Sequence, residues 1–157
     1  MNESPITKEG YDKVQDELNH LIKVVREELR ITISEARELG DLKENAEYHA
    51  AKEKQGHIEG RIAELQGKLA GAKVIDPTQS KSERIVFGAT VTIIHSETEK
   101  VTTYQIVGED EAMTDANKIS YSSPLGKALI GKEEGDEVIV KAPKGDITYE
   151  VEEVSYK

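Results

Sequence analysis

Residues 11–36, YDKVQDELNHLIKVVREELRITISEA, carry the pattern that decides the fold of the first half of the chain. Apolar side chains recur there every three or four residues, which is the spacing of one face of an α-helix. The members of this seam are Tyr11, Val14, Leu18, Leu21, Val25, Leu29, Ile33 and Ala36. Their steps of 3, 4, 3, 4, 4, 4 and 3 follow a heptad pattern with one four-residue stutter. The stretch therefore predicts a long helix with a single apolar seam.

A second seam of the same kind follows after a short break. Its members are Tyr48, Ala51, Gln55, Ile58, Ile62, Leu65, Leu69 and Ala72. Two matching seams predict an antiparallel helical hairpin that turns at residues 40–45, with arms of about 30 residues and about 45 Å. Such a rod is too thin to hold a globular core. Its most distinctive place is the far tip.

The second half of the chain has a different pattern, because three prolines and alternating Val, Ile, Thr and Tyr replace the helical spacing. Strands are expected at 85–94, 101–107, 118–122, 137–141 and 147–154, with a turn at 142–146 and a helix at 124–130. The polar segment 76–83 contains a helix-stopping proline and is interpreted as a linker. The predicted fold class is α+β, with a coiled-coil hairpin in 1–75 and a small sheet domain with one helix in 84–157.

Composition excludes several classes of function. The 157 residues include no Cys, which excludes disulfides and thiolate metal sites. One Phe, six Tyr and no Trp are a poor supply for aromatic stacking platforms and disfavour them. A net charge of −10 repels free nucleic acid and favours a protein partner. Glycine-rich phosphate loops are missing, and so is a Gly-x-Ser-x-Gly turn. The first residues lack the basic and apolar regions of a signal peptide, so a cytoplasmic protein is expected.

Two acidic residues at the predicted tip have two interpretations. Asp41 and Glu44 are three residues apart, which is the spacing of a capping box at the start of the second arm. The same two carboxylates could instead share a magnesium ion, which takes one or two carboxylates from a protein and keeps several waters. Two carboxylates do not make a nuclease, so further ligands would have to come from another molecule. The spacing alone leaves both interpretations open.

Basic side chains also line the first arm. Lys23, Arg26, Arg30 and Arg37 follow helical spacing toward the tip, and Lys52 enters the second arm nearby. This stripe could guide a phosphate backbone, or it could be a solvated face with ion pairs to interleaved glutamates. His49, Glu53 and His57 share one helix face, but they span about 12 Å and lack a fourth ligand, which argues against a zinc site.

Four segments of the chain resemble one family. Residues 38–53, ELGDLKENAEYHAAKE, closely resemble the signature of the bacterial transcript cleavage factors, the Gre family. Residues 6–11 (ITKEGY) and 86–91 (VFGATV) resemble the starts of that family's two domains, and 122–132 (SSPLGKALIGK) resembles its C-terminal signature.

The resemblance implies a hairpin that enters the secondary channel of RNA polymerase and an FKBP-like domain that docks at the channel rim through Ser122, Ser123, Pro124 and Leu125. The protein would stimulate the polymerase's own cleavage of backtracked RNA and would not be an enzyme itself. Asp41 and Glu44 would hold a weakly bound Mg²⁺ shared with the polymerase, while the basic stripe faces the nascent RNA 3′ end. A monomer is expected.

Three alternatives stay open beside this interpretation. A non-cleaving relative could enter the same channel and inhibit the polymerase, although that would need an altered tip. A prolyl isomerase would need an aromatic-lined pocket, which this composition does not favour. A plain coiled-coil adaptor would not need the acidic tip at all.

Overall fold

The computed structural model of the chain describes residues 4–40 and 44–157. These residues form two compact units, one of Tyr11–Ala72 and one that joins the residues up to Gly10 to Lys73–Lys157. The sequence placed residues 1–75 in the hairpin, whereas the structure groups residues 4–10 and 73–75 with the sheet unit. β1 (Ser4–Thr7) pairs with β2 (Ala72–Ile75) in a two-stranded sheet, and the Thr7 N–H donates to Glu111 of the sheet unit at 3.1 Å.

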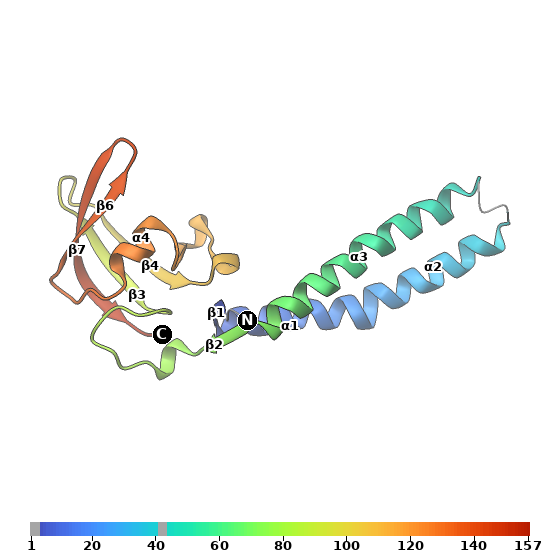
Figure 1. Cartoon of the computed structure of the whole chain (residues 1–157), viewed down its shortest axis with the longest axis horizontal. Coiled ribbons are helices and arrows are strands. Elements are labelled where there is room, and N and C mark those ends of the chain that lie inside the picture. The colour runs from blue at the N-terminus through green and yellow to red at the C-terminus, as the bar shows by residue number, and fades with distance from the viewer. Residues whose placement is uncertain (1–3, 41–43) are drawn as a thin grey trace. The chain divides into compact units, whose positions relative to one another are not determined.

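The first unit is the predicted helical hairpin (Figure 1). One arm consists of α1 (Lys8–His20), a π-helical turn (Leu21–Val25) and α2 (Arg26–Glu38), and the other arm is α3 (Ala46–Ala70). All sixteen seam positions named above are buried or half-buried. The hairpin prediction is therefore confirmed, together with the helix faces that make it.

Two groups of buried side chains hold the arms together. Leu18 and Leu21 from the first arm pack with Ile62 and Leu65 from the second. Nearer the tip the buried residues are Leu29, Ile33, Ala36 and Ala51. Apolar burial between the arms is the main source of stability in a structure this thin.

Ion pairs cross between the arms at their edges. The Arg26 guanidinium donates to Glu59 at 2.8 and 2.7 Å, and that of Arg61 donates to Glu17 at 2.7 and 3.0 Å. The hydrogen bond from Arg61 lowers the pKa of Glu17. Because these side chains are 40–46% exposed, each pair adds little stability and mainly aligns the arms.

The π-helical turn lies where the sequence stutters. Three successive steps of four, from Leu21 to Ile33, would carry the seam about 120° around an α-helix with 3.6 residues per turn. The Arg26 N–H donates to the Leu21 carbonyl, five residues back, so this turn takes in one extra residue. The seam consequently stays on the side that faces α3.

The second unit contains a five-stranded sheet in the order β5-β4-β3-β7-β6. Its strands are β3 (Thr90–His95), β4 (Val101–Val107), β5 (Lys118–Ser120), β6 (Glu137–Ala142) and β7 (Gly145–Ser155). Only β4 and β5 pair in parallel, and a bulge between Thr92 and Ile93 interrupts the register with β7. The single helix here is α4 (Pro124–Leu129), so among the described residues the predicted α+β class is confirmed.

The core of this unit lies between the sheet and α4. Leu129 of α4 is fully buried with side chains from β3, β4, β6 and β7. The full set is Ile85, Ala89, Val91, Ile93, Ile106, Leu129, Val138, Val140 and Val151. In the described part of the chain, no helix is long and apolar enough to cross a membrane.

Two expectations for this half need correction. The strand predicted at 85–94 begins at Thr90, because Gly88 has a left-handed φ of 91° and the Ala89 N–H closes a turn onto the Val86 carbonyl. Ile85 is buried in the core although it is not in a strand. Segment 76–83 contains a short 3₁₀ turn (Pro77–Gln79) with a buried proline, and it belongs to the second unit. Further 3₁₀ turns are Glu109–Glu111 and Thr114–Ala116.

Candidate functional sites on the hairpin and the sheet unit

The hairpin tip begins where α2 ends. Leu39 is the C-cap of α2, and Gly40 follows with a left-handed φ of 83°, the usual conformation of a glycine that terminates a helix. The second arm does not begin at Asp41, as the capping-box interpretation requires. The N-cap of α3 is Asn45, and Glu44 precedes it in a turn. The capping box is therefore wrong for Glu44, while Asp41 lies outside the described residues.

Glu44 is available for binding. Its side chain is exposed, and within 4–40 and 44–157 it makes no hydrogen bond or ion pair. It borders a shallow hollow of about 370 Å³ at the tip, lined by Leu39, Gly40, Glu44, Asn45, Ala46 and Glu47. A free carboxylate is a ligand that Mg²⁺ accepts, but one carboxylate does not hold the ion by itself. Over the described residues, no group of three or more His, Asp or Glu side chains could hold a metal.

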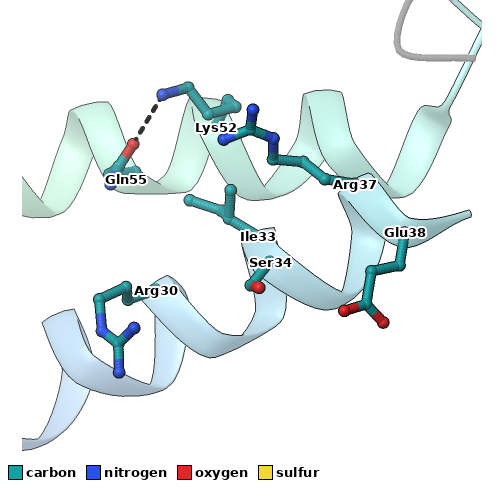
Figure 2. Close-up of a pocket in the computed structure, with 7 residues that line it drawn as sticks. All are labelled: Arg30, Ile33, Ser34, Arg37, Glu38, Lys52 and Gln55. Carbon is teal, nitrogen blue, oxygen red and sulfur yellow. Dashed lines mark hydrogen bonds between the residues drawn. The ribbon is translucent and has the colours of Figure 1, made fainter. Parts of the chain in front are cut away.

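A groove between α2 and α3 collects part of the basic stripe. It has a volume of about 500 Å³, and Figure 2 shows the residues that line it, which are Arg30, Ile33, Ser34, Arg37, Glu38, Lys52 and Gln55. Arg30 and Arg37 come from α2 and Lys52 from α3, where its ammonium donates to Gln55 at 3.0 Å. Three cationic side chains thus line the same groove as the buried Ile33.

The other members of the predicted stripe lie elsewhere. Arg26 is engaged with Glu59 in the pair between the arms, and neither Arg26 nor Lys23 lines the groove. Arg30 is bonded to Glu27 within α2, and this hydrogen bond raises the pKa of the guanidinium. Neither Arg37 nor Lys52 has an ion pair with any residue in the described part of the chain, so both charges of the groove are uncompensated there.

The histidine face of α3 is exposed to solvent. His57 Nε2 lies 3.9 Å from a Glu53 carboxylate oxygen, and both side chains are 78% exposed. His49 instead makes an edge contact with the ring of Tyr48, with centroids 5.7 Å apart. These residues form a solvated helix surface.

The segment predicted to dock on a partner has mixed roles. Ser123 is the N-cap of α4, since its hydroxyl accepts from the Gly126 N–H at 3.1 Å and donates to the Ser120 carbonyl at 2.7 Å. Leu125 packs against the core of the sheet unit, and Ser122 donates to Glu109 at 2.8 Å. Pro124 is the exposed member of the four. The segment is therefore a rigid surface feature with one apolar ring pointing outward.

Sequence reasoning missed two residues that organise these sites. Asn45 caps α3 and also donates a hydrogen bond to the end of α2. The sequence offered a local indication of the cap, because Asn is a favoured N-cap residue and this one directly precedes a helical stretch. Glu111 accepts from the backbone N–H groups of Thr7 at 3.1 Å and Gly108 at 2.8 Å, and from the Thr7 hydroxyl. No local pattern indicates a contact between residues 104 positions apart.

Family models match both units. The model for the N-terminal domain of transcription elongation factors matches residues 4–74, and the GreA/GreB C-terminal model matches residues 79–156. These two matches, over the hairpin and the sheet unit, identify the chain as a transcription elongation factor. More particularly, the chain belongs to the GreA/GreB family.

Similar proteins cover the whole chain. Transcription elongation factor GreA of Halorhodospira halophila is 53% identical over 158 residues, covering 100% of both proteins. The GreA of Pseudomonas aeruginosa is 50% identical over 99% of both. Among solved structures, GreA factor homolog 1 of Thermus thermophilus aligns with 29% identity and a TM-score of 0.45, covering 98% of this chain and 99% of that one.

Proposed function

We propose that this elongation factor stimulates the RNA polymerase's own cleavage of backtracked RNA, with carboxylates delivered at the hairpin tip. Factors of the GreA/GreB family act on RNA polymerase. The observation that carries the proposal is the exposed Glu44 carboxylate, which has no partner among the described residues and lies at the far end of two long helices. We further propose that the hairpin enters the polymerase's secondary channel as a monomer, in the bacterial cytoplasm.

The hairpin acts as a rod of defined length. The α3 helix has 25 residues, which corresponds to about 38 Å at 1.5 Å per residue. Its seam is buried against the first arm, so the two helices support each other and resist bending. A rod of this kind can carry a side chain deep into a channel while the sheet unit remains outside.

The tip residues fit a shared metal ion but not a resident one. Glu44 offers exposed carboxylate oxygens, and Asp41 precedes it by three positions in the chain. When bound, magnesium supplies an activated water and charge stabilisation for phosphodiester hydrolysis. This chain's contribution is to present the carboxylates and hold their backbone, and the polymerase provides the remaining ligands.

The groove and the segment at α4 supply the other contacts in this proposal. Arg37 and Lys52 lie within two turns of the tip and would attract RNA phosphates near the 3′ end. Pro124 offers an exposed apolar ring beside the capped start of α4, where the sheet unit would dock on the polymerase.

The test is a cleavage assay on a stalled, backtracked elongation complex with magnesium. Asp41→Asn and Glu44→Gln remove one anionic ligand each at nearly constant size, so we expect stimulated cleavage to be lost while binding to polymerase persists. Glu35→Gln, an exposed carboxylate of α2 outside the tip, is the matched control and should keep wild-type cleavage. Wild-type cleavage by both tip variants would rule out the metal-sharing role.

A further inference from the structure

Asn45 joins the two arms of the hairpin with a single side chain. Its Oδ1 accepts from the Tyr48 N–H at 3.0 Å, which satisfies one of the free amides in the first turn of α3. Its Nδ2 donates to the Ala36 carbonyl at 2.5 Å, in the last turn of α2, and lies 3.4 Å from the Gly40 carbonyl. One amide group thus connects the end of the first helix to the start of the second.

These two bonds require the chemistry of an asparagine. The side chain must accept from an N–H and donate to a carbonyl at the same time, over a short reach. Serine and threonine cap helices well, but a hydroxyl is shorter and reaches only one of these two places. Aspartate can accept but cannot donate, and its charge would oppose the carbonyl oxygens at the end of α2.

The position of this bridge matters for the tip. Asn45 follows Glu44 directly in the chain, and its side chain donates to the Ala36 and Gly40 carbonyls at the end of the first arm. The bridge therefore fixes the distance between the ends of segment 40–45 and the backbone direction at Glu44. A carboxylate that must meet an ion held by another molecule benefits from such a fixed backbone, because less freedom is lost on binding.

We propose that Asn45 is a positioning residue, whose side chain ties the end of α2 to the start of α3 so that the Glu44 carboxylate is aimed at the shared metal ion. The inference rests on the proposed function. Asn45 itself stays engaged with the two helix ends and acts through its neighbour.

The experiment compares Asn45→Ser with wild type in the cleavage assay, with purified full-length protein and a magnesium titration. Serine keeps the N-cap but loses the bond to Ala36, so circular dichroism should show an intact hairpin. The concentration of factor that half-saturates the polymerase should stay within about twofold of wild type, whereas the magnesium concentration for half-maximal cleavage should rise about tenfold, the cost of one lost hydrogen bond. High magnesium should then restore most of the rate.

Two comparisons separate the possible failures. Asn19→Ser makes the same change on the exposed face of α1 and should leave the magnesium dependence unaltered. If Asn45→Ser loses its helices or its affinity for polymerase, or if its magnesium dependence equals that of wild type, Asn45 does not position the tip. Glu44→Gln tests the proposed function independently, because full cleavage by that variant overturns the function. If Glu44→Gln is inactive while Asn45→Ser has the magnesium dependence of wild type, only this inference is overturned.

Discussion

Deleting Val24 should be tolerated, although deleting one residue from a helix normally disrupts every contact beyond it. One residue corresponds to a rotation of about 100° around an α-helix. Val24 lies in the π-helical turn Leu21–Val25, which already contains one residue more than an α-helical turn. Its loss should convert that turn to α-helix and leave Leu29, Ile33 and Ala36 facing the second arm.

The matched control is deletion of Ile31, an exposed β-branched residue like Val24 but in regular α2. Ile31 is 47% exposed and Val24 is 39% exposed, so the two deletions remove similar surface. Without Ile31, the helix beyond turns by about 100° and moves Ile33 and Ala36 off the seam, where they are 9% and 3% exposed. If the π turn converts to α-helix instead, Ile33 and Ala36 keep their places, but the residues between the turn and the deletion rotate and Leu29 leaves the seam.

The expected difference follows from the area that each deletion uncovers. Exposing a buried Leu or Ile costs about 1.5–3 kcal/mol, so deletion of Ile31 should cost about 2–4 kcal/mol of unfolding free energy. Deletion of Val24 should cost less than about 1 kcal/mol, since no seam residue moves. Urea unfolding followed by helical circular dichroism measures both values. Equal losses of unfolding free energy for the two deletions would show that the π turn does not contain an extra residue that the hairpin can lose.

Three further changes test other parts of the structure. Leu65→Ala should cost the hairpin about 2–5 kcal/mol, because this side chain is 1% exposed, and a loss below about 1 kcal/mol in urea unfolding would contradict the packing. The hydrogen bond from Arg61 lowers the pKa of Glu17 from its ordinary value of 4.5. The ionised Glu17 therefore stabilises the fold by less than about 1 kcal/mol at pH values above 4.5, and this stabilisation is lost as the pH falls through the lowered pKa. The unfolding free energy of Glu17→Gln, measured as a function of pH, should lack this loss at low pH. If the variant and the wild type give identical pH curves, the Arg61–Glu17 pair does not contribute. Glu111→Gln removes a charged acceptor from the Thr7 N–H and should speed exchange of that amide hydrogen, by an amount corresponding to about 1–3 kcal/mol. Unchanged protection of this amide would show that Glu111 does not hold the N-terminal strand in place.

The seams could be predicted because helix burial is a local and periodic property. Every third or fourth residue of a helix lies on one face, so the positions of Leu18, Ile33 and Leu65 in the sequence already define which side is covered. The strand at 101–107 and the start of α4 at Pro124 follow in the same way from alternation and from a proline at a first-turn position. The resemblance of segment 38–53 pointed to the family through residue identity, not through geometry.

The helix start at the tip shows where local pattern stops being sufficient. Both Asp41 and Asn45 are residue types that cap helices, and spacing cannot choose between them. Asn45 is the cap because its amide can also reach the Ala36 carbonyl on the opposite arm, which depends on how close the arms come together. That distance is a property of the packed hairpin.

By itself, then, the sequence determined the α+β class, the two helical faces and the strand-rich second half, because each depends on residues within a few positions of one another. Tertiary structure alone decided that Thr7 joins the sheet unit through Glu111, and that Arg37 and Lys52 share one groove while Arg26 is neutralised by Glu59. Those contacts link residues far apart in the chain. The physical reason is that hydrogen bonds and charges act over a few ångströms in space, and only the folded chain brings distant residues within that range.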